Sequence, residues 1–311
     1  MTSTRAPSLP ATTRWVLFVA LAVLAALACA AASSLRRVTP TTAAPAQGTR
    51  VVLVGTGGLT WPDVSPGGTP SLWGLLAGGA AANLTVVAVH PTTCPVDAWV
   101  SLSAGDRAGQ PDLPGTSDPA CTPVPLVRDG QVSGFAGLVA TAHARPYDAV
   151  PGRLAARLGE SGQCVGSVGP GADLAAAAPT GAVTHRAPTV AAALDGPCRV
   201  VLVDLGAVAD RSGARADRVG ELDAAVSEVL GQVPGPVQVL VASLSGAGTP
   251  GYLGLLAARG PAAPAGLLAS ASTRNTGLVQ SSDLTATLLA RAGVARPGAL
   301  PGAELEVAGL A

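Results

Sequence analysis

The chain has 311 residues, of which 48 % are hydrophobic and 12 % are charged, and its formal net charge is zero. This composition excludes an intrinsically disordered chain, and the length suffices for at least one buried core. The neutral charge and the 3 % aromatic content indicate no basic or base-stacking surface, so we do not expect a nucleic-acid partner.

An apolar run at residues 15–32 is flanked by arginines and contains no helix breaker. Its length suits a membrane-spanning helix, which needs roughly 17–25 residues. The alternatives are a signal peptide, cleaved to give a secreted protein, and a lipoprotein lipidated at Cys29. We expect single-pass attachment to the cell membrane, with the following parts: a cytoplasmic tail (1–14), a transmembrane anchor or signal peptide (15–33), a linker (34–49) and an extracytoplasmic domain (50–311).

Apolar runs and helix-period patterns alternate along the rest of the chain, which predicts an α/β fold. We expect a doubly wound, mostly parallel sheet with helices on both faces. Thr69 and Pro70 have the types preferred at an N-cap and at the first helical position. Residues 108–135, rich in Pro, Gly and Asp, predict a long surface excursion. The expected strands are 51–54, 84–89, 164–168, 198–204, 237–243 and 277–280, and the expected helices are 69–77, 150–159, 216–230 and 284–292.

Four cysteines follow the apolar run, and an even number in an exported domain favours two disulfides. Of the three possible pairings, we predict the nearest-neighbour one, Cys94 with Cys121 and Cys164 with Cys198. A metal site is the alternative, but the sequence has no CxxC pair.

Ligand sites in open α/β sheets lie at the carboxyl ends of strands. Two familiar kinds of site fit poorly there. A dinucleotide fingerprint beginning at Gly55 lacks its third glycine, and a nucleophile elbow at Ser245 lacks both its leading glycine and a histidine later in the chain. The residues expected to line the crevice are Thr56, His90, Thr93, Asp97 and Asp204.

The order of segments resembles that of the alkaline phosphatase-like superfamily, which includes phosphodiesterases, sulfatases and phosphoglycerate mutases. The resemblance covers about residues 50–300 and is closest to the extracytoplasmic domain of uncharacterised actinobacterial membrane proteins. The segments that carry it are Val51–Leu59 (the first strand), Thr69–Ala77 (similar to a "TPNLDRLA" helix), Pro91–Gly105 (the nucleophile segment), Asp204–Ala214 (an Asp and His loop), Val241–Gly246 (an "SDHG" turn) and Gly277–Leu289 (similar to "VSLVDLAPTLL").

The same resemblance implies that the catalytic apparatus is substituted. Asp210 is the one metal ligand of the family that the resemblance retains, and no histidine follows His185 to serve as the last ligand. Two divalent metals need several carboxylates and imidazoles, so we expect no metal cofactor. The relic positions are Gly57 (first Asp), Cys94 (nucleophile), Asp210 (Asp), Ala214 (its His), Leu244 and Ser245 (the Asp and His of "SDHG").

We therefore expect a non-catalytic binding or scaffold domain whose partner is an envelope glycan, a lipid carrier or a membrane protein. The alternative is a phosphoester or sulfoester hydrolase with a rearranged site, in which Cys94 or Thr93 attacks and a divalent metal such as zinc assists. Structural roles remain open for three polar residues: Asp97 as the cap of a helix before a buried Trp99, Asp210 as the partner of Arg211 or Arg215, and His90 as a lone structural histidine.

Overall fold

The computed structural model describes residues 49–112, 120–208, 214–246, 251 and 253–308. All of them belong to one compact unit, Thr41–Leu310. The expected tail, membrane anchor and most of the linker, together with Cys29 and Asp210, lie outside the described residues. Within the described part, no helix combines the length and the apolar character needed to cross a membrane.

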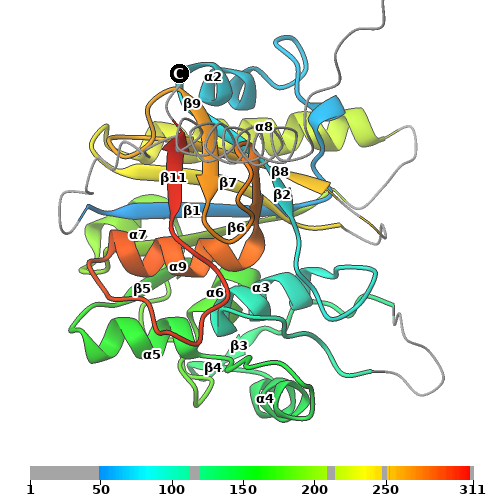
Figure 1. Cartoon of the computed structure of the whole chain (residues 1–311), viewed down its shortest axis with the longest axis vertical. Helices are drawn as coiled ribbons and strands as arrows, with labels where there is room; N and C mark the ends of the chain where they lie inside the picture. Colours follow the sequence, from blue (N-terminus) through cyan, green and yellow to red (C-terminus); the bar gives the residue numbers. More distant parts are fainter. Residues whose placement is uncertain (1–48, 113–119, 209–213, 247–250, 252, 309–311) are drawn as a thin grey trace, which may run out of the picture. The chain divides into compact units, whose positions relative to one another are not determined.

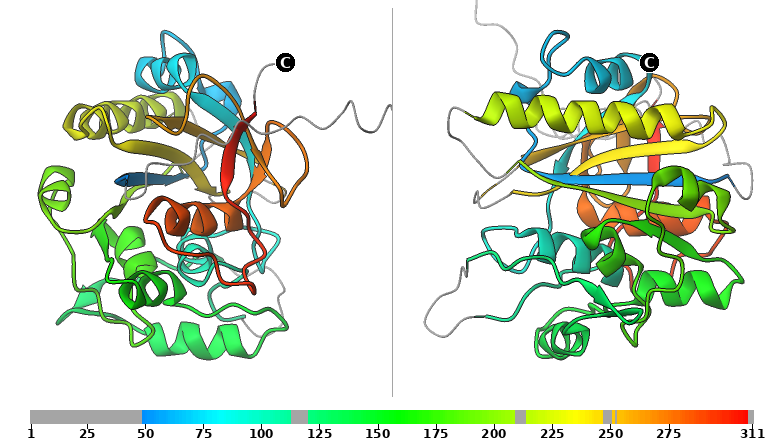
Figure 2. Two further views of the ribbon diagram at one scale, coloured as in Figure 1. Left: turned by 60° about the vertical axis from the view of Figure 1, so that its left-hand side comes forward. Right: turned by 180° about the vertical axis from the view of Figure 1, so that it is seen from behind.

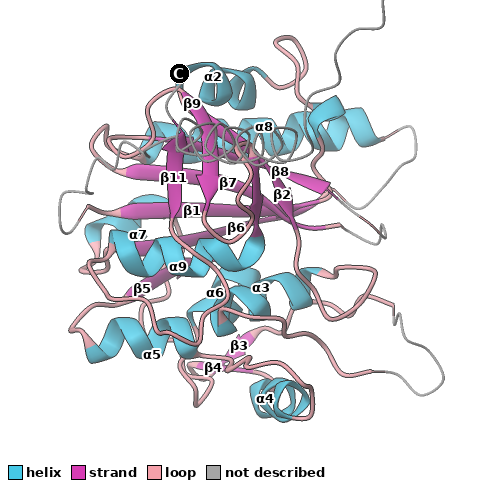
Figure 3. Ribbon diagram, viewed as in Figure 1, coloured by secondary structure: helices cyan, strands magenta, loops and turns pink. Residues whose placement is uncertain are grey.

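A mixed sheet forms the centre of this unit (Figures 1 and 3). Among the described residues it has nine strands in the order β11-β9-β2-β8-β7-β1-β6-β5, with β10 paired to β2, and β3 and β4 form a separate hairpin. The bounds are β1 Val51–Gly57, β2 Ala80–Thr85, β3 Val127–Arg128, β4 Gln131–Val132, β5 Val165–Val168, β6 Val200–Ala207, β7 Gln238–Ser245, β8 Leu253–Arg259, β9 Gly266–Ser270, β10 Leu278–Gln280 and β11 Leu305–Ala308.

The centre of the sheet is parallel because β1 lies between β6 and β7 and runs in the same direction as both. Val51 is level with Val200 on one side and with Gln238 on the other. All seven residues of β1 are buried, as expected for a strand covered on both faces. β8 and β11 pair antiparallel with their neighbours, so the sheet is mostly but not wholly parallel.

Helices cover both faces of the sheet (Figure 2). Helices α2, α7 and α8 pack on one face, and α3, α4, α5, α6 and α9 contribute to the core on the other. The doubly wound arrangement predicted from the alternating pattern is confirmed. The bounds are η1 Trp61–Asp63, α2 Pro70–Gly78, α3 Pro95–Ala104, α4 Phe135–His143, α5 Arg153–Glu160, α6 Pro170–Ala176, α7 Val190–Asp195, α8 Arg215–Gln232 and α9 Ser281–Arg291.

Some element predictions were wrong. The strand expected at 84–89 is β2, which begins at Ala80 and ends at Thr85, because its small residues pair with β8. The surface excursion expected at 108–135 contains β3 and β4. Strands β8, β9 and β11 were not predicted, because Ala, Gly and Leu dominate where β-branched residues usually mark a strand.

Helix α2 begins as predicted, with Thr69 at the N-cap and Pro70 first, but its capping side chain comes from another helix. The buried Asp223 of α8 accepts hydrogen bonds from the backbone N–H groups of Ser71 (3.1 Å) and Leu72 (2.8 Å). Thr69 Oγ1 instead accepts from Ser65 N. A carboxylate at a helix N-terminus satisfies free N–H groups and complements the helix dipole, so Asp223 fixes α2 onto α8.

Replacing Asp223 with alanine is expected to lower the free energy of unfolding by about 2–3 kcal/mol, since two charge-assisted hydrogen bonds are lost at a buried site. Urea denaturation followed by circular dichroism measures the loss. Asp217→Ala, at an exposed acidic residue in the first turn of α8, is the matched control. Equal stability of the two variants would contradict the capping role.

Candidate functional site

The ends of three parallel strands and the segment before α3 meet through backbone hydrogen bonds. Gly58 N donates to Ser245 O (2.8 Å), Val208 N donates to Gly57 O (2.8 Å), and Gly246 N donates to Thr93 O (3.2 Å). We call the junction of Gly57, Thr93 and Ser245 the strand-end site. It is where the resemblance places the first metal-binding carboxylate, the neighbour of the nucleophile and a metal-binding histidine.

At the strand-end site, a serine fills the space that a side chain at position 57 would need. A Cβ atom built on Gly57 would lie 2.2 Å from Ser245 Oγ and 2.9 Å from Ala207 Cβ. The Ser245 side chain is buried, and no described residue hydrogen-bonds its hydroxyl. A side chain at position 57 would therefore force Ser245 Oγ and the Ala207 methyl group to shift.

The adjoining relic position, Leu244, belongs to the core. A Cβ on Gly55 would lie 2.6 Å from Leu244 Cδ1 and 2.4 Å from the Trp99 ring. Trp99 is itself buried, as its alternative structural role predicted, and it also covers Gly171. An indole ring packed against two glycines thus occupies the space beneath the strand end.

Cys94, at the expected nucleophile position, is bonded to Cys121, and Cys164 is bonded to Cys198. This is the nearest-neighbour pairing predicted from the sequence. Because the thiolate is the nucleophilic form of cysteine, Cys94 in this state cannot attack a substrate. Cys94 is also buried and forms the N-cap of α3.

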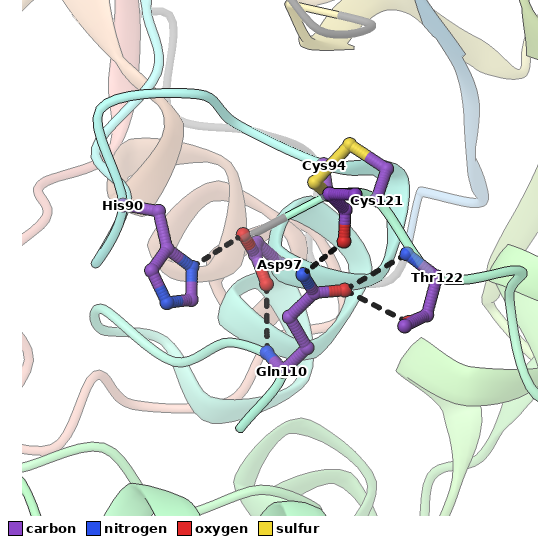
Figure 4. Close-up of a disulfide and its surroundings, with 7 residues drawn as sticks. His90, Cys94, Asp97, Gln110, Cys121 and Thr122 are labelled. Carbon is purple, nitrogen blue, oxygen red and sulfur yellow. Dashed lines mark hydrogen bonds and ion pairs between the residues drawn. A yellow bond between two sulfur atoms is a disulfide. The ribbon is translucent and has the colours of Figure 1, made fainter. Parts of the chain in front are cut away.

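His90 and Asp97 are held in a network close to this disulfide (Figure 4). His90 Nδ1 lies 3.0 Å from Asp97 Oδ2, and Nε2 lies 3.0 Å from Asp112 Oδ1. The other Asp97 oxygen accepts from Gln110 N at 2.7 Å, and Arg145 binds Asp112 at 2.9 Å. Both ring nitrogens of His90 are engaged by carboxylates, so neither is open to serve as a general base.

Burial raises the pKa of the Asp97 carboxyl above its ordinary value, and hydrogen bonds from His90 and Gln110 only partly offset this effect. The opposite holds at the surface, where the hydrogen bond from His90 and the charge of Arg145 lower the pKa of Asp112. Arg145 also lies 3.3 Å from His90 Nε2, so the guanidinium contacts both the imidazole and Asp112. The network holds α3 against the 110–112 segment.

Asp204 lies within β6, before the last residues of the strand, and its carboxylate contacts α6. Its two oxygens accept from Gly171 N and Gly206 N, each at 2.8 Å. Thr56 Oγ1 donates to Gly206 O at 2.9 Å, so this second predicted crevice residue is also bonded to the backbone. Burial raises the pKa of the Asp204 carboxyl more than these two backbone bonds lower it.

A raised folded-state pKa makes the folded chain bind more protons than the unfolded chain, so stability falls as pH rises from about 3.8 through the raised value. Asp204→Asn cannot ionise and is expected to reduce this loss. Urea denaturation from about pH 4 to about pH 7 measures the free energy of unfolding of wild type and variant. The difference between the two curves isolates Asp204, because Asp97 titrates in both proteins. Parallel stability curves would contradict the assignment.

Ala214, the expected histidine position, is exposed just before α8. The next residue, Arg215, donates to both carboxylate oxygens of Asp63 and to Gly58 O. Burial alone would raise the pKa of Asp63, but hydrogen bonds from Arg215 and Thr60 outweigh it and hold this pKa low. The ion pair ties the start of α8 to the turn after β1.

Among the described residues, the side chains around the strand-end site do not fit a divalent metal pair. Ser243 Oγ already accepts from Leu59 N, and the nearest groups to Gly57 are a hydroxyl and a methyl group. Divalent zinc requires imidazole, thiolate or carboxylate ligands. Within the described ranges, one group of three such side chains converges, Cys164, His185 and Cys198, and its two sulfur atoms are bonded to each other.

Sequence reasoning missed Gln110, Asp112 and Arg145, which complete the His90 network. The first two lie in the stretch read as a surface excursion, and nothing in its composition indicates their contacts. It also missed the role of Ser245, because the resemblance indicates only that a histidine is absent there and not which space the serine fills.

No protein-family model matches the sequence, and neither does any curated protein. Solved structures do match. Human ectonucleotide pyrophosphatase/phosphodiesterase 5 aligns over 80 % of this chain and 96 % of its own, with 11 % identity and a TM-score of 0.53. A Vibrio parahaemolyticus protein of the alkaline phosphatase superfamily aligns over 85 % and 71 %, with 14 % identity and a TM-score of 0.49. Identities this low bear on the fold alone: the chain shares its fold with the human structure, the alkaline phosphatase-like fold expected from the order of segments.

Proposed function

We propose that this protein is a non-catalytic, membrane-anchored, extracytoplasmic domain that binds or scaffolds a partner in the cell envelope. The observation that carries the proposal is the packing of Ser245 on Gly57, with 2.2 Å between Oγ and a Cβ built on the glycine. A hydrolase of this fold would need a carboxylate at that point. The strand end is instead filled by small side chains. This packing suits a domain that retains the fold of the hydrolases without their catalytic residues.

The other polar groups support the same proposal. Cys94 is bonded to Cys121, both ring nitrogens of His90 face carboxylates, and Asp204 binds two backbone N–H groups. Each of these three side chains already has a structural partner. The proposed partner is an envelope glycan, a lipid carrier or a membrane protein, and residues 15–33 would hold the domain at the membrane, or would direct secretion if cleaved.

A second candidate is a phosphoester or sulfoester hydrolase with a rearranged, zinc-assisted site. Its support is the similarity to a structure named as a phosphodiesterase. With Cys94 in a disulfide, Thr93 is the remaining nucleophile of the two expected, and it is 5 % exposed within the strand-end site.

The test uses the compact unit, residues 41–310, which contains both disulfides and both core clusters. We expect no stoichiometric zinc or manganese by mass spectrometry. With either metal added, we expect no turnover of nitrophenyl phosphate mono- and diesters or sulfate beyond that of Thr93→Val. Stoichiometric metal together with turnover abolished by Asp210→Ala would overturn the proposal.

A further inference from the structure

An apolar groove lies on the α2 face of the sheet, apart from the strand-end site. Its cavity measures about 300 Å³ and is lined by Trp61, Val64, Trp73, Leu76, Ala77 and Ala81. We call it the tryptophan groove. Pockets of this size with aromatic and aliphatic walls are typical of sites for apolar ligands, and none of the six residues carries a charge.

The outer side of α2 has no charged residue. Of its nine residues, the exposed ones are Pro70, Trp73, Gly74, Ala77 and Gly78. A surface helix of a globular domain normally carries polar or charged residues on its outward side, and an apolar outer side indicates that another apolar phase covers it. Trp73 is 47 % exposed, an unusual position for the largest apolar side chain.

The apolar surface continues from α2 onto the sheet. Ala81 lines the groove, and its partner across the β2–β9 pairing is Leu267. Paired residues of adjacent strands project from the same side of a sheet, so Leu267 adjoins the groove. Leu267 is 45 % exposed, so a large apolar side chain besides Trp73 is presented to solvent next to the groove.

One wall of the groove is fixed in place. Trp61 Nε1 donates to Asn83 Oδ1 at 2.8 Å, and Asn83 Nδ2 donates to Gly277 O at 3.1 Å. The indole N–H of Trp61 is thereby satisfied, and its ring presents an apolar surface. The groove is preformed, so an occupant need not order this wall.

We propose that the tryptophan groove and Leu267 dock the domain onto a lipid bilayer. Tryptophan is the residue enriched at the membrane–water interface, and an uncharged face avoids the cost of removing ions from water. The proposal rests on membrane attachment in the proposed function. Sixteen residues, 33–48, separate the apolar run from the described chain and span at most about 56 Å, so an anchored domain would stay within reach of the bilayer.

The experiment is flotation of residues 41–310 with phosphatidylcholine vesicles, with and without phosphatidylglycerol. We expect binding to both lipids that persists in high salt, because the contact is apolar. Trp73→Ser and Leu267→Ser, both at exposed positions, should each weaken partitioning by about tenfold. Leu126→Ser, at an apolar residue that is 52 % exposed before β3, is the matched control and should leave partitioning unchanged.

Absence of flotation, or equal weakening by Leu126→Ser, would overturn the docking proposal. So would a dimer in sedimentation that Trp73→Ser dissolves without any vesicle binding, since the face would then belong to a second copy of the chain. Quenching of tryptophan fluorescence by brominated phosphatidylcholine, reduced in Trp73→Phe to the part that comes from Trp61, would support it. The unit used lacks residues 15–33, so vesicle binding tests the docking surface alone. Metal content and turnover test the proposed non-catalytic function separately.

Discussion

Replacing Cys94 and Cys121 together with alanine is expected to lower the free energy of unfolding by about 3–4 kcal/mol. The bridge closes a loop of 27 residues, and the chain-entropy estimate for a loop of that length gives this range. Removing the Cys94 sulfur also leaves a gap at a buried position at the start of α3. Urea denaturation of the oxidised unit, residues 41–310, measures the loss.

A control with reductant separates the stability contribution of this bridge from that of Cys164–Cys198, which closes a loop of 34 residues. Reductant added to the double variant opens only the second bridge, whereas reductant added to wild type opens both. A thiol assay on denatured, unreduced wild type should find no free thiol among residues 41–310. A free thiol at Cys94, or a loss below about 1 kcal/mol in the double variant, would contradict the prediction and favour a nucleophilic cysteine.

Much of the fold could be predicted from patterns in the sequence. The run Val51–Val54, ended by glycines, is the buried central strand, and the helical spacing of Val219, Leu222 and Val226 marks the buried side of α8. These patterns are visible because burial on a sheet or a helix repeats with a fixed period. The repeat of buried residues does not reveal which strands are neighbours. The position of β8 between β2 and β7 is therefore known only from the structure.

Less of the candidate site could be predicted. The sequence showed at which positions metal ligands are substituted. It did not show how the substituted residues pack, because their contacts join segments far apart in the chain. Ser245 fills the space at Gly57 across 188 positions of sequence, and Asp223 caps α2 across 151 positions from Leu72. Such contacts follow from tertiary packing, which a single sequence does not encode in local spacing.

Replacing Gly57 with aspartate, the residue that a hydrolase of this fold would carry, is expected to destabilise the domain by about 3 kcal/mol. Its Cβ would meet Ser245 Oγ at 2.2 Å and Ala207 Cβ at 2.9 Å, so the strand end must move apart or the carboxylate must enter the core unpaired. Gly57→Ala tests the steric part alone, because alanine adds the same Cβ without a charge. We expect that variant to lose about 1–3 kcal/mol.

A double-mutant cycle assigns the clash to Ser245. Ser245→Gly removes the hydroxyl, which no described residue hydrogen-bonds, and Gly57→Ala in that background should cost about 1–2 kcal/mol less than in wild type. Relief will be partial, because the Ala207 methyl group remains. If the two losses simply add, Ser245 does not fill the space at Gly57. The packing argument against a carboxylate would then rest on the Ala207 methyl group alone, and the non-catalytic proposal would lose the observation that carries it.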